Sequence, residues 1–324
     1  MKACVAGVGA IGGWLASLLA ESGADVSLLA RGETLANLKA HGLRVRRKGK
    51  DTAFRLTASG DPSKLGQPDA IVIATKGQSI PALAPAIARM LGRQTAIVPA
   101  INGIPWWFFQ VPVTPFSGAH LQSVDPGGAV SRAIPADRVI GCVVHASAWS
   151  PEPGLIEVQG EDRLIFGEPD CAARPRTAVF AGAIPKARIE SVISGNIRLN
   201  IWTKLWGNMT MNPLSVLTGA TTDQMLADPD MRALVRAMME EMKALGATIG
   251  LPLAMTPDER MDITRRLGAI KTSMLRDWEA GRPLEIDPIL GALVEIADLL
   301  SAPAPNLRAV LGLMRVRMSA GGKA

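Results

Sequence analysis

The first residues of the chain restrict its fold more than any other stretch. The run KACVAGV at 2–8 is aliphatic, GVGAIG at 7–12 is a G-x-G-x-x-G pattern, and a helix-like stretch follows at 12–22. A strand, a glycine turn and a helix in this order are typical of the first βαβ unit of a doubly wound sheet. We therefore predict a Rossmann-like α/β domain at the N-terminus.

The glycines of this turn suit a dinucleotide. Gly7 permits the tight turn, Gly9 lets the backbone approach a pyrophosphate, and Gly12 allows the helix to pack closely on the strand. The pyrophosphate would bind the N–H groups at the start of the helix, where the positive end of the helix dipole lies. The predicted cofactor-binding residues of the turn are Gly7, Gly9, Ala10, Ile11 and Gly12.

The end of the second predicted strand, residues 24–30, indicates which dinucleotide binds. An NAD-binding protein usually places Asp or Glu there, on the ribose hydroxyls. This chain has Ala30 and Arg31 instead, and a guanidinium is suited to a 2′-phosphate. The sequence favours NADP (NADPH). The alternative is that Arg31 is a surface residue and Glu33 reaches the ribose.

Further aliphatic runs alternate with helix-like stretches and predict the rest of the sheet. The predicted strands cover residues 24–30, 70–76, 95–100, 139–150, 154–159, 163–168 and 187–191, and the predicted helices include 12–22 and 79–91. Lys76 and Asn102 each follow a strand, and ligands of open α/β sheets bind at the carboxyl ends of strands. We therefore expect both side chains near the cofactor.

From about residue 196 the strand pattern disappears. Helices are predicted at 197–217, 223–249, 257–279, 285–301 and 305–317. Because 324 residues exceed one typical core, two domains are expected. We assign residues 1–195 to an NADP-binding Rossmann-like domain and residues 196–324 to an all-helical substrate and catalytic domain.

The first of these helices carries a polar stripe. In NIRLNIWTKLWGNMTMNPLSVLTG, at 196–219, Lys204, Asn208 and Asn212 are spaced by four. At about 100° per residue they fall within roughly an 80° arc of the helix. Packing alone does not explain such a stripe, although Lys204 could extend from a buried helix to water and the asparagines could bond backbone.

Reduction chemistry offers a use for the stripe. Hydride delivery to a ketone makes an alkoxide, which needs a proton and a nearby positive charge. None of the three histidines lies in the helical half, whereas Lys204 can supply both, with its pKa expected to be lowered by burial. Asn208 and Asn212 would extend the same face as hydrogen-bonding groups.

Several motifs together resemble one family, the ketopantoate reductases (2-dehydropantoate 2-reductases), over essentially the whole chain. They are GVGAIG with Arg31, TK at 75–76, NG at 102–103, WTKLWGNMTMNP at 202–213, SML at 273–275 and EID at 285–287. The Lys-x-x-x-Asn-x-x-x-Asn-Pro spacing and its distance from Glu-Ile-Asp are more specific than the glycine turn.

The resemblance implies NADPH-dependent reduction of a 2-oxo acid to a 2-hydroxy acid, in a cleft between a Rossmann domain and a helical domain. It implies that Lys204 is the catalytic general acid, that Glu285 assists it, and that Lys76 lies at the cofactor site. By the same resemblance, the residues that bind substrate or cofactor are Asn102, Asn208, Asn212 and Ser273. Dimers are common in the family, so a homodimer is expected.

Two departures from the family pattern concern the substrate. Leu290 stands where an asparagine is typical, and GIPWWFF at 103–109 is bulkier and more apolar than the usual continuation. They make a larger or more hydrophobic 2-oxo acid than ketopantoate one possible substrate.

Two other functions are also compatible with the sequence. One is an opine-type dehydrogenase that reduces an imine, and the other is a non-catalytic NADP(H)-binding sensor.

Composition narrows the classes of partner. The net charge is +6, but the densest basic run, RVRRKGK at 44–50, lacks interleaved aromatics and is expected to be a solvated loop or strand face. We expect no nucleic acid and no membrane partner. Three widely spaced cysteines, Cys4, Cys142 and Cys171, predict packed or free thiols, no metal site and a reducing, cytoplasmic compartment.

Overall fold

The chain divides into two compact units. The structure is a computed structural model that describes residues 1–321, apart from the side chains of residues 161 and 162. One unit comprises Met1–Ile101 with Gly128–Asn200, and the other Asn102–Gly127 with Ile201 onward. The sequence placed the boundary at 195/196 and left 102–127 in the first domain. The structure differs in assigning this segment to the second unit.

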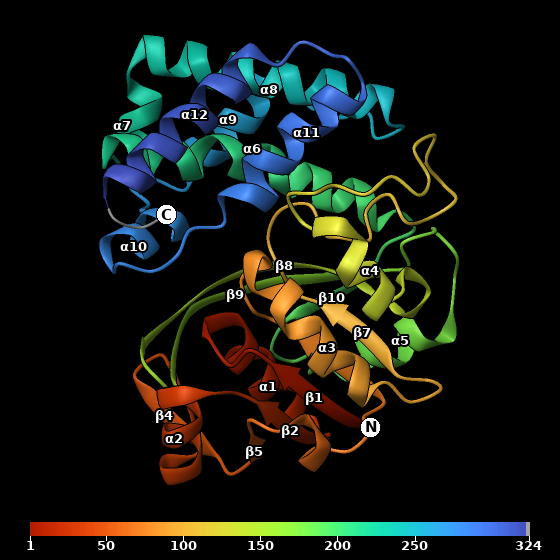
Figure 1. The fold of residues 1–324 in the computed structure, drawn as a ribbon. Helices are drawn as coiled ribbons and strands as arrows, with labels where there is room; N and C mark the ends of the chain where they lie inside the picture. Colours follow the sequence, from red (N-terminus) through yellow and green to blue (C-terminus); the bar gives the residue numbers. More distant parts are fainter. Residues whose placement is uncertain (322–324) are drawn as a thin grey trace. The chain divides into compact units, whose positions relative to one another are not determined.

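The first unit contains the expected doubly wound sheet. Its parallel strands are β1 (Lys2–Ala6), β2 (Asp25–Leu29), β5 (Thr57–Ser59), β6 (Ala70–Ile73) and β7 (Ala96–Pro99), in the order β5-β2-β1-β6-β7. Its helices are α1 (Ala10–Glu21), α2 (Gly32–His41), α3 (Ile80–Met90), α4 (Ala129–Ala133) and α5 (Pro175–Gly182), with short 3-10 turns at Pro62–Lys64, Gly77–Ser79, Pro126–Gly128 and Ala136–Arg138. Since β1 is flanked by β2 and β6, its carboxyl end is central in this sheet (Figure 1).

A second sheet packs on the other side of α1. It contains β3 (Leu43–Arg47), β4 (Lys50–Phe54), β8 (Gly141–Glu152), β9 (Leu155–Gly167) and β10 (Glu190–Ile193), in the order β10-β9-β3-β4 with β8 antiparallel to β9. The α1 helix contacts strands of both sheets, and a Cβ on Gly13 would lie 2.5 Å from Ile156 of β9. The glycine therefore permits close packing of α1 on this sheet.

The second sheet corrects one prediction and adds a hairpin. Residues 154–159 and 163–168 are one continuous strand, β9, and the basic run 44–50 lies in a β3–β4 hairpin that was not identified as such. Arginines of the hairpin pair with Asp51, Glu152 and Glu21. The run is thus a charged strand face, one of the two interpretations expected from sequence.

The second unit is helical, as predicted. Its elements are α6 (Ile197–Thr218, whose first residues belong to the first unit), α7 (Thr222–Ala227), α8 (Pro229–Thr248), α9 (Pro257–Arg266), α10 (Ser273–Glu279), a π-helix (Asp287–Gly291), α11 (Ala292–Leu299) and α12 (Pro305–Ala320). The α8 helix contacts α7, α9, α11 and α12, and these helices are grouped together in Figure 1.

Three predicted helices are interrupted, each for a local reason. The stretch 223–249 breaks where Asp228 caps α8 and Pro229 begins it, because the Asp228 side chain accepts from the Met231 N–H. The stretch 257–279 breaks around Gly268, whose φ is +77°. The stretch 285–301 starts as a π-helix containing Pro288, which has no N–H to donate.

Aromatic side chains unite α6 with the segment 102–127. Trp202 and Trp206 of α6 are fully buried, and the Trp206 indole donates to the Met239 carbonyl at 2.8 Å. The Phe108 ring stacks on Trp202 with ring centroids 6.1 Å apart. The aromatic core explains why segment 102–127 belongs to the helical unit.

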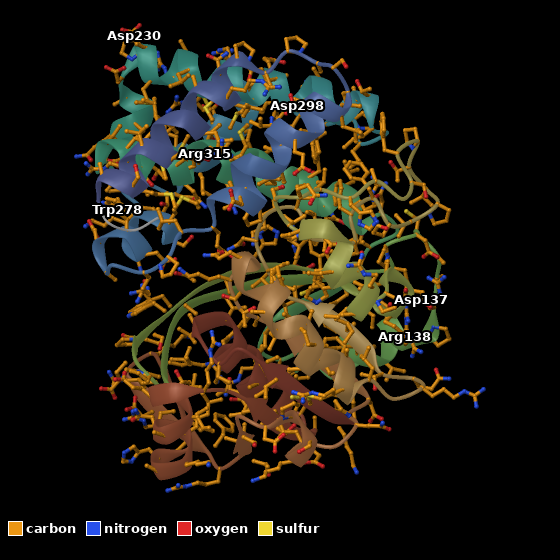
Figure 2. The ribbon with its side chains drawn as sticks, viewed as in Figure 1. Asp137, Arg138, Asp230, Trp278, Asp298 and Arg315 are labelled. Atoms are coloured by element: carbon orange, nitrogen blue, oxygen red, sulfur yellow. The ribbon has the colours of Figure 1, made fainter. Side chains whose placement is uncertain are left out.

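Another aromatic contact of the helical unit lies near its C-terminal end. Arg317 of α12 lies over Trp278 of α10, which is labelled in Figure 2, at 5.2 Å from the ring centroid.

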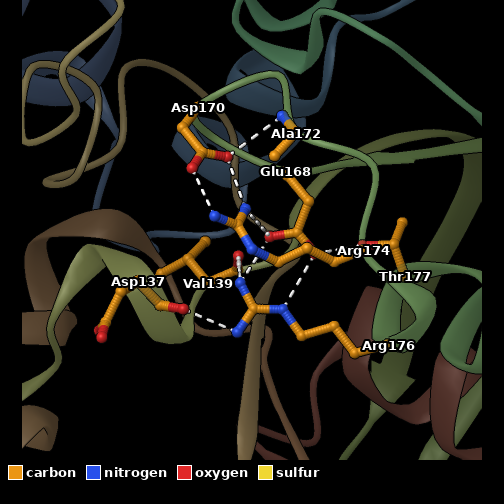
Figure 3. Close-up of polar contacts among 8 residues, drawn as sticks. All are labelled: Asp137, Val139, Glu168, Asp170, Ala172, Arg174, Arg176 and Thr177. Atoms are coloured by element: carbon orange, nitrogen blue, oxygen red, sulfur yellow. Dashed lines mark hydrogen bonds and ion pairs between the residues drawn. The ribbon is translucent and has the colours of Figure 1, made fainter.

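A buried carboxylate connects the end of β9 with α5 (Figure 3). Glu168 is 2% exposed and accepts from Arg176 at 2.5 and 2.9 Å, from Arg174 at 3.1 Å and from Thr177 at 2.6 Å. Arg174 also bonds Asp170, and this hydrogen bond lowers the pKa of that carboxyl to about 2. The cluster satisfies the charge of Glu168 inside the first unit.

All three cysteines are free thiols, as expected, and Cys4 and Cys142 are buried whereas Cys171 is exposed. Burial raises the pKa of the Cys4 thiol to about 11. Within residues 1–321, no helix is both long enough and apolar enough to cross a membrane.

Candidate active site

The glycine turn after β1 has the geometry that a dinucleotide requires. Gly7 adopts φ +92°, and a Cβ there would lie 2.5 Å from the methyl group of Thr75. A Cβ on Gly12 would lie 1.9 Å from the Gly7 carbonyl oxygen, so the turn cannot form with a side chain at this position. Gly9 is exposed, has open space around its Cα, and precedes Ala10 and Ile11 at the start of α1.

Two observations test whether these residues fit a dinucleotide. The N-cap residue of α1 is Gly9, which has no side chain that could accept from the first N–H groups of the helix. These groups are therefore left for an anion. Beside Gly7, the buried Thr75 hydroxyl has no hydrogen-bond partner among the described residues. A buried hydroxyl without a partner is costly, so it indicates a ligand that completes it. The residues therefore fit the predicted cofactor.

The remaining candidates of the first unit lie at strand ends. Arg31 follows β2, is exposed and occupies the N-cap position of α2 without a capping hydrogen bond from its side chain, and Glu33 is exposed in the first turn of that helix. Lys76 is partly buried, beyond the end of β6. Gly7, Arg31 and Lys76 thus follow three adjacent strands, β1, β2 and β6, at the carboxyl edge of one sheet.

We expect Gly9→Ala to weaken cofactor binding without unfolding the protein. Its φ of −86° suits any residue and a Cβ meets nothing within 4 Å, so the thermal midpoint is expected to stay that of the wild type. The methyl group would occupy space that the pyrophosphate approaches. We expect the Kd for NADPH to rise about tenfold or more, the equivalent of one charge-assisted hydrogen bond.

Fluorescence titration of NADPH measures this effect. Gly182→Ala is the matched control, because that glycine also has no neighbour within 4 Å but ends α5. Equal NADPH affinity in wild type and Gly9→Ala would contradict the assignment of the turn.

In the second unit, Asn102 connects Lys204 with Glu285. The Lys204 ammonium donates to Asn102 Oδ1 at 2.9 Å, and Asn102 Nδ2 is 3.4 Å from Glu285 Oε2. All three side chains are partly buried. Because an ammonium only donates and a carboxylate only accepts, the two partners fix the orientation of the amide between them. The structure thus brings together three of the predicted residues.

The backbone next to Asn102 holds it in place. The Ile104 N–H donates to the Pro288 carbonyl at 2.8 Å, and Gly103 has φ +80°. A Cβ on Gly103 would lie 2.3 Å from the same carbonyl oxygen. Only glycine permits this approach, which places Asn102 close to the segment that carries Glu285.

The other predicted residues are placed less directly. Asn208 is partly buried and Asn212 is 6% exposed, and both follow Lys204 on α6 at intervals of one helical turn. The stripe inferred from the sequence therefore lies on a real helix. Ser273 is the exposed first residue of α10, whose N-cap Thr272 bonds the Leu275 N–H. No described contact joins Ser273 to Lys204.

The residues that depart from the family pattern are core residues. Trp106 is 3%, Trp107 1% and Leu290 0% exposed. Their bulk fills the helical unit, and the structure does not present them as a substrate surface.

Sequence reasoning did not identify Arg260, whose guanidinium packs on Gly207 of α6. A glycine in the middle of a buried helix was the available signal.

A parallel sheet with a glycine turn of the dinucleotide-binding type in one unit, and a lysine held by an amide in the other, are typical of a dinucleotide-dependent oxidoreductase. Family models described as ketopantoate reductase PanE/ApbA and its C-terminal domain match residues 3–106 and 196–318. The 2-dehydropantoate 2-reductase of Mesorhizobium japonicum is 40% identical over 97% of each chain. The chain belongs to the ketopantoate reductase family.

Solved structures agree with this membership. A protein from Ralstonia solanacearum, assigned as a ketopantoate reductase, shares 42% identity with a TM-score of 0.96 over 100% of this chain and 99% of that one. The 2-dehydropantoate 2-reductase of Methylococcus capsulatus shares 29% identity with a TM-score of 0.85 over 100% and 99%. The fold expected from the sequence is confirmed in both domains.

Proposed function

We propose that the protein reduces a 2-oxo acid to a 2-hydroxy acid with NADPH, and that the substrate is 2-dehydropantoate. The observation that carries this proposal is the contact of Lys204 with Asn102, because it holds an ammonium group ready to donate a proton. The 40% identical relative is named for this activity. Trp106, Trp107 and Leu290 are buried, which favours 2-dehydropantoate over a bulkier substrate.

The first unit would hold the cofactor. When bound there, NADPH would supply a hydride for the carbonyl carbon of the substrate. The N–H groups that begin α1 would bind its pyrophosphate, and the Thr75 hydroxyl would form a hydrogen bond with the cofactor. Exposed Arg31 would bind the 2′-phosphate, which makes NADPH preferred over NADH.

The second unit would supply the proton. Lys204 donates it to the carbonyl oxygen, and before transfer its positive charge stabilises the negative charge that develops there. Asn102 Oδ1 directs the ammonium, and Glu285 keeps the amide in the orientation that presents this oxygen. Asn208 and Asn212 would donate hydrogen bonds to substrate oxygens from the same helix.

A substrate panel tests the proposal. Purified protein is incubated with 2-dehydropantoate or aromatic and branched 2-oxo acids, with NADPH and NADH in parallel, and nicotinamide absorbance is followed. We expect the highest kcat/KM with 2-dehydropantoate and NADPH. Activity that appears only after an amine is added would indicate imine reduction instead, and NADPH binding without turnover would indicate a sensor.

A further inference from the structure

The guanidinium of Arg260 is partly buried against the backbone of α6 and has no ion pair with a carboxylate among the described side chains of residues 1–321. On α9, its Nη1 donates to the Thr264 hydroxyl at 2.9 Å, and a Cβ on Gly207 would lie 1.9 Å from its Nη2. Burial lowers the pKa of the Arg260 guanidinium, and no neighbouring charge contributes to that shift. Gly207 thus leaves the space that this partly buried cation fills.

Acidic residues on the same helix are all engaged elsewhere. Asp258 pairs with Arg236, and Asp262 pairs with Arg265. Glu259 accepts from the backbone and hydroxyl of Thr256 at the start of α9. Within the part of the chain that the structure describes, no carboxylate forms an ion pair with Arg260. Partial burial weakens the hydration of this cation and no described carboxylate compensates it, which suggests that a ligand provides the anion.

The position of Arg260 indicates which ligand. Its guanidinium lies on Gly207, which is three residues beyond Lys204 and directly before Asn208. Side chains three apart on a helix are neighbours. In a 2-oxo acid the carboxylate and the keto group sit on adjacent carbons, so the groups that bind them must also be neighbours.

We propose that Arg260 binds the carboxylate of the 2-oxo acid, while Lys204 serves its keto oxygen. The planar guanidinium matches a carboxylate by two parallel hydrogen bonds, and its Nη1 contact with Thr264 fixes its orientation. Gly207 is then a specificity element, because any side chain there would displace the guanidinium. This inference rests on the proposed reduction of 2-oxo acids.

Steady-state kinetics of the full-length enzyme with NADPH test the assignment. Arg260→Met removes the charge and keeps much of the length, and Arg260→Lys keeps a charge without the planar fork. Each is assayed with 2-dehydropantoate and with its uncharged carboxamide. For Arg260→Met we expect the KM for the acid to rise about 10- to 100-fold, as for lost charge-assisted hydrogen bonds, and the KM for the carboxamide to stay unchanged. For Arg260→Lys we expect a KM for the acid between those of the wild type and Arg260→Met.

Two controls separate binding from a structural role. Arg265→Met removes an exposed arginine of the same helix, whose partner is Asp262, and should leave both KM values unchanged. Gly207→Ala, which displaces the guanidinium, should raise the KM for the acid selectively. Since no carboxylate of the described residues pairs with Arg260, the thermal midpoint of Arg260→Met is expected to equal or exceed that of the wild type.

The outcomes distinguish this inference from the proposed function. Equal rises in KM for acid and carboxamide, or a lowered thermal midpoint with no selectivity, would overturn the role of Arg260. So would an unchanged KM for the acid in both Arg260 variants of an otherwise active enzyme. A wild-type enzyme without turnover of any 2-oxo acid would instead refute the proposed function.

Discussion

Lys204→Ala is expected to lower kcat by about 10²- to 10⁴-fold, the usual contribution of a positioned general acid. The ammonium is held at 2.9 Å from Asn102 Oδ1, and its removal takes away both the proton and the positive charge beside the developing alkoxide. Lys204 lies in the second unit, whereas the glycine turn lies in the first. The Kd for NADPH should therefore be unchanged.

Single-turnover measurements with 2-dehydropantoate isolate the chemical step for this variant. Asn102→Ala should lose less activity than Lys204→Ala, because it leaves the proton donor and removes only the group that directs it. Lys271→Ala is the matched control, an exposed lysine that pairs with Glu279. Lys271→Ala should keep the wild-type kcat. If Lys204→Ala kept it as well, the proton would come from another group.

Local sequence patterns predicted four of the five strands of the first sheet and the helix that carries Lys204, whereas the short strand β5 was not predicted. The glycine turn between β1 and α1 depends on spacing within a dozen residues, and the α6 stripe depends on helical periodicity. Both signals are local, and the structure has both elements where they were predicted. The β3–β4 hairpin was missed because β4, KDTAF, is mostly exposed and has no apolar alternation.

The site itself depends on contacts that no local pattern contains. Asn102 is 102 residues from Lys204 and 183 from Glu285 in sequence. Their meeting requires segment 102–127 to leave the first sheet and dock on Pro288, where the turn at Gly103 permits close contact. The sequence patterns indicated Lys204 and Asn102 separately and the family resemblance added Glu285, but no local pattern predicted the contacts that join them. Arg260 was missed for the same reason, since only the packed structure shows it against Gly207.

Glu168→Ala is expected to destabilise the protein by about 3 kcal/mol or more, as for one partner removed from a buried ion pair. The carboxylate is 2% exposed and accepts four hydrogen bonds, from Arg174, Arg176 and Thr177 (Figure 3). Arg176 also donates to the carbonyls of Asp137 and Val139, so its position depends on several parts of the first unit. Without Glu168, the Thr177 hydroxyl loses its acceptor and the Arg176 guanidinium loses its carboxylate partner.

The neighbouring Asp170 provides a matched comparison for this prediction. It makes a bidentate contact with Arg174 but is much more exposed, so Asp170→Ala should cost no more than about 1 kcal/mol. Urea unfolding of both variants, followed by circular dichroism, measures the two losses. Equal losses would show that Glu168 is no more important than a surface carboxylate. A larger loss for Glu168→Ala with NADPH affinity preserved would show that the cluster stabilises the first unit without taking part in cofactor binding.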